Sequence, residues 1–164
     1  MTAATRALVA AVAVAVLLLT SCAADPAPDA STTVDFLALV GGTAPPVPPL
    51  DTSRIERGEI VYQQHCASCH GAELQGAPDW KALNADGTWK PPPHDSTGHT
   101  WHHPDQLLTD IIRDGGGFPE TRMPAFASVL SDTDIDALLE YLKANWAEQE
   151  RAFQWQVTWQ EANR

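Results

Sequence analysis

The stretch Cys66-Ala67-Ser68-Cys69-His70 decides how the rest of the sequence is interpreted. Two thiols separated by two residues lie on one helical turn, so both sulfurs reach the edge of one porphyrin and add to its vinyl groups as thioethers. The histidine after the second cysteine then lies beneath the iron and offers it an imidazole nitrogen. The stretch therefore predicts one covalent haem c at Cys66 and Cys69, with His70 as the first axial ligand.

Two other interpretations of a C-x-x-C pair fit the sequence less well. A thioredoxin-like redox pair belongs in a strand–helix–strand pattern, which the surrounding sequence lacks. A zinc site of this kind needs a second C-x-x-C pair, and the chain contains only three cysteines. Haem attachment is the interpretation that uses both thiols and the adjacent histidine.

Met123 is the first candidate for the second axial ligand. The chain has two methionines, and Met1 is lost if the predicted signal peptide is removed. A thioether is a soft ligand that favours Fe(II), and a His/Met pair raises the potential of the iron. Core packing is the alternative role for this side chain. The rival ligands lie in one histidine-rich loop: His94, His99, His102 and His103.

The N-terminus has the pattern of an exported lipoprotein. Arg6 is the only charge before residue 25, and a short apolar stretch, 7–19, follows it. That stretch is shorter than the roughly 20 residues that span a bilayer. Leu19-Thr20-Ser21-Cys22 resembles the bacterial lipobox, whose cysteine receives lipid. We therefore expect a signal peptide over 1–21, lipidation of Cys22, and anchoring by lipid on the outer side of the cytoplasmic membrane.

The remaining sequence is expected to form three parts. Residues 22–52 are rich in Pro and Ala and predict a semi-stiff tether. Residues 53–147 contain the haem motif and predict the folded domain. Residues 148–164 predict an amphipathic extension. Apolar and polar residues alternate over 153–160, which fits a strand. Apolar pairs four residues apart, however, favour a helix that folds back over the domain.

Three helices are predicted within the folded domain. The first runs from about residue 53 to the haem motif, and the second covers about 104–114 with an apolar stripe along one side. The third begins at 131–134, a cluster of residues that favour the N-cap. The connection over 71–103 is longer than a compact domain usually leaves without regular structure.

Together these features resemble a class I monohaem cytochrome c over about 53–146. Gly58 and Tyr62 in the first helix, with Leu138 and Tyr141 in the last, resemble the residues at which those two helices cross in that family. The resemblance implies an all-α fold, with three main helices around one covalent haem and a long loop that wraps it.

The resemblance also implies a role for Pro78 and a function. Pro78 resembles the proline whose carbonyl accepts the second N–H of the axial histidine, a bond that would fix the tautomer of His70. The implied function is single-electron transfer with His/Met ligation and no catalysis of its own. The chain shows no Ser-His-Asp arrangement or phosphate-binding loop that would indicate another chemistry.

The charge of the chain limits its partners. It has 21 acidic side chains against 10 Lys and Arg, a net charge of −11. This excess argues against binding to nucleic acid, whose phosphates need basic side chains. It suits redox partner proteins with a basic docking patch.

The histidine-rich loop supports alternative functions. His99, His102 and His103 are close enough in sequence to bind copper or zinc, which predicts a second metal site and a copper-handling role. A different alternative is an iron with an open sixth position, as in a haem-based sensor of small ligands or a redox enzyme subunit.

Overall fold

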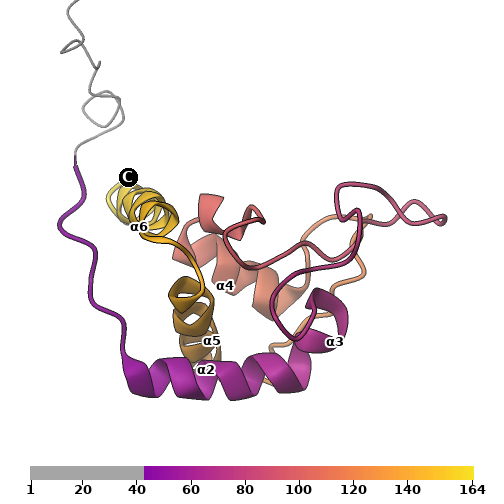
Figure 1. Ribbon diagram of the computed structural model, residues 1–164, viewed down its shortest axis with the longest axis horizontal. Helices are drawn as coiled ribbons and strands as arrows, with labels where there is room; N and C mark the ends of the chain where they lie inside the picture. Colours follow the sequence, from indigo (N-terminus) through magenta and orange to yellow (C-terminus); the bar gives the residue numbers. More distant parts are fainter. Residues whose placement is uncertain (1–42) are drawn as a thin grey trace, which may run out of the picture. The chain divides into compact units, whose positions relative to one another are not determined.

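The computed structural model describes residues 43–164, so the predicted signal peptide, Cys22 and most of the tether lie outside the described residues. The described part contains five α-helices and one short 3-10 helix (Figure 1). It contains no strand, and its one isolated bridge pairs Leu83 with Trp89. The predicted all-α fold is confirmed. Within this part, no helix combines the length and apolar character needed to cross a membrane.

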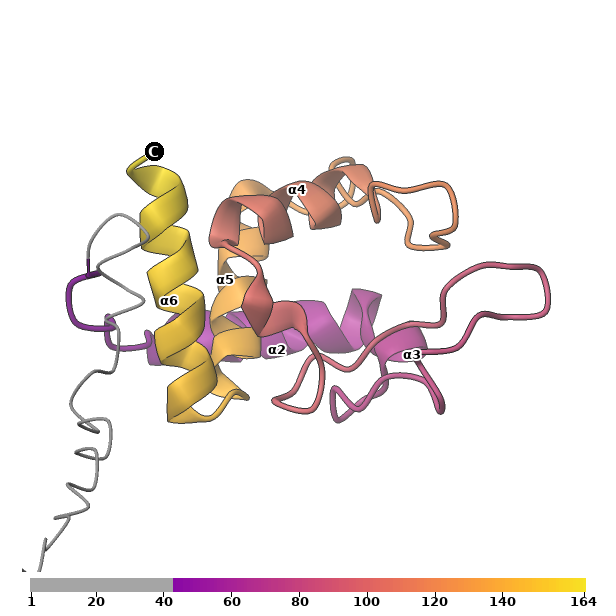
Figure 2. The ribbon, with the colours of Figure 1, turned by 90° about the horizontal axis from the view of Figure 1, so that it is seen from above.

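Helix α2 (Thr52–His65) begins at Asp51, whose carboxylate accepts hydrogen bonds from the backbone N–H groups of Ser53 and Arg54. It crosses α5 (Asp132–Ala144), as Figure 2 shows. A Cβ at Gly58 would overlap the backbone carbonyl of Ala137, so glycine is what allows this close approach.

Aromatic and aliphatic side chains fill the crossing of α2 and α5. The rings of Tyr62 and Tyr141 lie 5.5 Å apart between centroids, and both side chains are buried. Leu138 is buried beside them. The crossing predicted between the first helix and the helix that contains Leu138 and Tyr141 is therefore confirmed.

A capping box fixes the start of α5. The Ser131 side chain accepts from the Asp134 N–H, and the Asp134 side chain accepts from the Ser131 N–H. Asp134 also pairs with Arg57 of α2 at 2.6 Å. The hydrogen bonds from Ser131 and then from Arg57 lower the pKa of Asp134 to about 2. One carboxylate therefore caps α5 and ties it to α2.

Helix α4 (Asp105–Asp114) follows Pro104 and ends at Gly115, whose φ of 79° suits glycine. Leu108 and Ile112 are its buried residues, whereas Leu107 is 41% exposed. Only part of the predicted apolar stripe therefore joins the core. The buried hydrophobic core as a whole comprises Val61, Tyr62, Leu74, Leu108, Ile112, Leu130, Ile135, Leu138, Leu139, Tyr141, Leu142 and Trp146.

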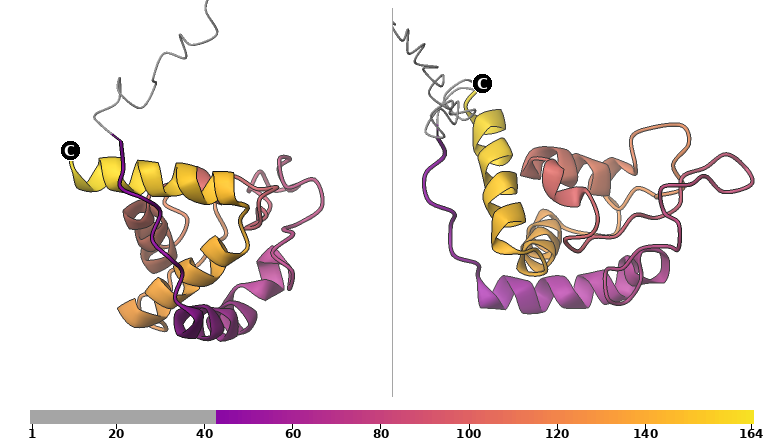
Figure 3. Two further views of the ribbon diagram at one scale, coloured as in Figure 1. Left: turned by 60° about the vertical axis from the view of Figure 1, so that its left-hand side comes forward. Right: turned by 45° about the horizontal axis from the view of Figure 1, so that its top comes forward.

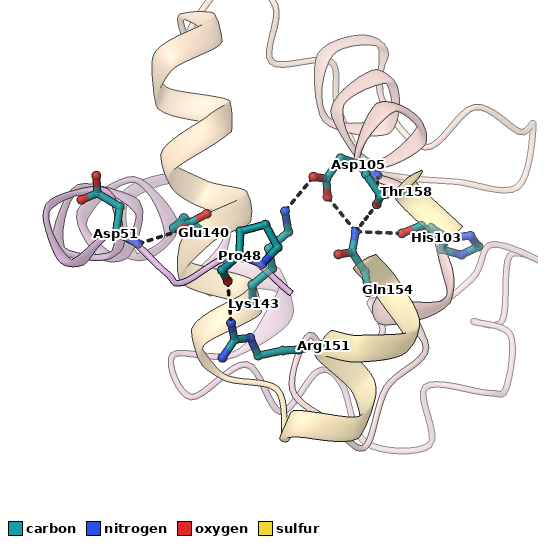
Figure 4. Close-up of polar contacts among 9 residues, drawn as sticks. All are labelled: Pro48, Asp51, His103, Asp105, Glu140, Lys143, Arg151, Gln154 and Thr158. Carbon is teal, nitrogen blue, oxygen red and sulfur yellow. Dashed lines mark hydrogen bonds and ion pairs between the residues drawn. The ribbon is translucent and has the colours of Figure 1, made fainter. Parts of the chain in front are cut away.

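The extension after the last predicted domain helix is itself a helix, α6 (Glu148–Ala162), and not a strand. It packs on the 3-10 turn η1 (Thr100–His102) and on the start of α4. Gln154, 2% exposed, donates to the carbonyl of His103 and to the carboxylate of Asp105 (Figure 4).

The segment before α2 lies along α6 (Figure 3). The indole N–H of Trp155 donates to the carbonyl of Pro45 at 2.6 Å, and Ala44 N–H donates to the Gln156 side chain. Arg151 reaches the carbonyl of Pro48 (Figure 4). The tether predicted up to residue 52 is therefore attached to the domain from Ala44 onward.

Candidate haem site

The two cysteines of the motif lie about one helical turn apart, at the junction of two helices. Cys66 ends α2 and precedes the single turn α3 (Ala67–His70). Cys66 is partly buried, Cys69 is exposed, and both thiols are free. Burial, and then the nearby Cys69, raise the pKa of the Cys66 thiol to about 11. Because neither thiol is in a disulfide, both sulfurs are available for thioether bonds.

His70 has one ring nitrogen engaged by the protein. Its side chain is buried, and Nδ1 lies 2.9 Å from the carbonyl oxygen of Pro92. Since a carbonyl only accepts, Nδ1 carries the proton and Nε2 keeps its lone pair. Burial lowers the pKa of His70, although the Pro92 bond opposes this. A neutral imidazole with a free Nε2 is the form that binds a metal.

The carbonyl that holds His70 was assigned wrongly from the sequence. Pro78 O accepts from the Lys90 ammonium at 3.3 Å instead. The residues between Ala77 and Pro91 form a loop, which the hydrogen bond from Ala77 N–H to Pro91 O closes. The next proline beyond this loop, Pro92, therefore reaches His70. The run 91–93 was visible in the sequence, but its position in space was not.

Met123 lies in a segment held against the end of α4. Its side chain is partly buried and packs against the core, as does that of Cys66. Phe126 N–H donates to Ile112 O at 3.0 Å, and the Phe126 ring meets the His65 ring edge-on at 6.4 Å. The structure therefore brings the methionine segment to the end of α2, next to the haem motif.

Two contacts join the loop that follows the haem motif to the loop that carries Met123. Trp89 N–H donates to Glu120 O at 3.0 Å. Asp86 forms an ion pair with Arg122, the neighbour of Met123 in sequence. The two loops are therefore fixed to each other as well as to the helices.

The histidine-rich loop does not bring three imidazoles together. The His99 ring stacks on Trp80 with centroids 5.3 Å apart, and the His102 ring lies edge-on to Trp101 at 3.8 Å. His103 meets only His99 among these rings, at 5.5 Å. Over residues 43–164, no group of three or more His, Cys, Asp or Glu is arranged to hold a metal ion. The predicted second metal site has no support here.

The residues of the site fit a covalent haem. The donor set comprises two free thiols, an imidazole with Nε2 free and a thioether, which are the ligands that c-type haem uses. His99 Nδ1 and Trp101 Nε1 are buried without a hydrogen-bond partner among the described residues. Glu150 Oε2 and Gln160 Nε2 lack a partner there as well, so the fit to haem rests on the donor set.

Comparison with known proteins gives consistent matches. Residues 53–142 match the protein family described as cytochrome c oxidase, cbb3-type, subunit III. The cbb3-type cytochrome c oxidase subunit CcoP of Azospirillum sp. (strain B510) is 29% identical over 108 residues, which are 66% of this chain and 32% of that protein. Subunit FixP of Azorhizobium caulinodans is 33% identical over 97 residues, 58% of this chain and 30% of that protein.

A smaller relative matches as well. Cytochrome c550 of Pseudomonas aeruginosa is 28% identical over 93 residues, 55% of this chain and 54% of that protein. The matching part thus spans about a third of each oxidase subunit and about half of the cytochrome c550. No solved structure matches the chain.

Proposed function

Because the chain belongs to the cbb3-type cytochrome c oxidase subunit III family, we propose that it carries single electrons on a haem whose iron is held between His70 and Met123. Membership of this family makes the chain a c-type cytochrome with covalent haem c, and haem-based electron transfer is its activity. The ligand pair, the lipid anchor and the partner are the proposed parts.

One observation above all supports His70 as a ligand. Its Nδ1–H donates to Pro92 O, which fixes the tautomer and leaves the lone pair of Nε2 free for iron. The bound haem supplies the one-electron couple. In the backbone next to the His70 ring, Gly76 N–H donates to His70 O at 2.7 Å, and the Tyr62 hydroxyl donates to Gly71 O at 2.7 Å. These bonds fix the backbone that follows the ligand, and His70 N–H donates to Cys66 O at 2.9 Å on the preceding side.

Met123 is proposed as the opposite ligand. It packs on the same core as Cys66, and its segment is fixed to α4 and to the end of α2. His94, the nearest rival, stacks directly on His70 with centroids 4.0 Å apart. A ring beside the first ligand is badly placed to reach the opposite face of the haem, which favours Met123.

Location and partner follow from the sequence and the relatives. Lipid on Cys22 would hold the domain at the outer side of the cytoplasmic membrane. Two relatives are named as subunits of a cbb3-type oxidase, so a membrane-bound oxidase is the proposed class of electron acceptor. The same names favour a second candidate function, in which the domain acts as part of such an enzyme.

Visible spectra of the purified protein, oxidised and reduced, with and without carbon monoxide, test the ligand pair. We expect a low-spin spectrum with the Met–Fe(III) charge-transfer band and no change with carbon monoxide. Met123→Ala should lose the band and bind carbon monoxide while the haem stays attached. A high-spin wild-type spectrum, or ready binding of carbon monoxide, would contradict His/Met ligation and favour the sensor or enzyme alternative.

A further inference from the structure

A second imidazole lies against the proposed axial ligand. The His94 ring stacks on the His70 ring with centroids 4.0 Å apart and planes 30° from parallel. His94 comes two residues after Pro92, whose carbonyl holds His70 Nδ1. One short piece of backbone therefore supplies both a hydrogen bond to the edge of the ligand ring and an aromatic surface against its face.

His94 is itself held in place through its ring. Its Nδ1 lies 2.8 Å from Thr100 Oγ1. The Thr100 hydroxyl donates to Pro93 O at 3.4 Å, so it accepts from His94, and the proton of His94 lies on Nδ1. The Tyr62 ring approaches edge-on at 6.5 Å. The partly buried ring therefore has one tautomer and one orientation.

The backbone of His94 is fixed as firmly as its ring. Its N–H donates to Leu74 O at 2.7 Å, and its carbonyl accepts from the Trp146 indole at 2.8 Å. An aromatic ring that is held through both its side chain and its backbone is suited to orient its neighbour.

The bond from His70 to Pro92 leaves one motion of the ligand unrestrained. A single hydrogen bond at Nδ1 fixes the tautomer but allows the ring to rock about the N–H···O direction. The plane of an axial imidazole sets how its orbitals overlap with those of iron. A ring stacked on one face blocks this rocking.

We propose that His94 is a positioning residue, which fixes the plane of the His70 ring and stabilises that ring when the iron is oxidised. This inference rests on His70 being an iron ligand, but not on Met123. Oxidation of a bound iron would draw electron density from the ligand ring, and the face of the stacked aromatic ring would stabilise the resulting positive charge. An aliphatic side chain at position 94 removes both effects.

The test compares His94→Leu with His94→Phe, which keeps an aromatic face. We expect His94→Leu to favour the reduced state about two- to tenfold; a tenfold change corresponds to a potential raised by about 59 mV for one electron. We also expect a changed pattern of haem-methyl NMR shifts in the oxidised protein, which reports the plane of the ligand ring. His94→Phe should stay within about twofold of wild type.

His102→Leu is the matched control, since His102 lies in the same loop but contacts Trp101 and Phe153 instead. It should leave the potential and the methyl shifts unchanged. If His94→Leu does not accumulate with haem, Thr100→Val replaces it, because it frees the His94 ring from its hydrogen bond. It should move both signals in the same direction.

Two kinds of failure can be told apart. Wild-type potential and methyl shifts in His94→Leu, or in Thr100→Val where that variant replaces it, would overturn the positioning role, even with the Met–Fe(III) band present. Equal shifts in His102→Leu would overturn it as well. Absence of the band in the wild type would refute Met123 ligation, yet leave the comparison of His94 variants valid.

Discussion

Asp134 shows how one side chain serves two elements. Its carboxylate accepts from the backbone N–H and the hydroxyl of Ser131 at the start of α5 and from Arg57 on α2. These bonds lower its pKa in the folded protein to about 2, from an ordinary value of 3.8. The stabilisation is therefore present above about pH 4 and disappears as pH falls through about 2.

We expect Asp134→Asn to unfold at a lower temperature than wild type at pH 7, with a difference that shrinks as pH falls from about 4 towards 2. Thermal unfolding followed by circular dichroism across this range measures it. Asp136→Asn is the control, since Asp136 lies on the same helix and is exposed. A difference for Asp134→Asn that stays constant with pH would contradict the assignment.

Single residues also mark the limit of what the sequence predicts. The haem motif, Met123 and Gly58 stand out because their chemistry or size is unusual at those positions. The acceptor for His70 was misassigned to Pro78 because the residues between Ala77 and Pro91 form a closed loop, after which Pro92 reaches His70. The stacking of His94 left no signal in the sequence, since it depends on this same path of the loop.

Among the elements, α6 is the one whose role was hardest to predict. Its sequence indicates a helix, but the family match ends at residue 142, before α6 begins. Its attachment uses polar contacts, which follow no hydrophobic period. Gln154 donates to His103 O, Asp105 Oδ1 and Thr158 Oγ1, while Lys143 pairs with Asp105 at 2.7 Å (Figure 4).

Gln154→Leu should therefore destabilise the protein by about 1–3 kcal/mol, because it leaves three partly buried acceptors without this donor. Denaturant unfolding gives the free energy of unfolding, and hydrogen exchange should show the loss concentrated in α6. Ala152→Leu, at an exposed position of the same helix, should change the stability much less. Equal effects of the two substitutions would show that the buried amide has no special role.

At the scale of the whole molecule, charge governs how partners meet. With a net charge of −11, encounter with a basic docking patch should be electrostatically steered. We expect the rate of reduction of a basic redox protein to fall as ionic strength rises from 10 to 200 mM, since the Debye length shrinks from about 30 Å to less than 10 Å. Stopped-flow kinetics measure this rate, and an unchanged or rising rate would contradict steering.

The contacts between the loop after His70 and the loop that carries Met123 affect the expected speed of electron exchange. Trp89 and Asp86 bind the loop after His70 to Glu120 and Arg122, beside Met123. If His70 and Met123 hold the iron as proposed, these contacts would resist separation of the two loops when the iron changes oxidation state. The nuclei would then rearrange little, and a small driving force would be enough for rapid exchange.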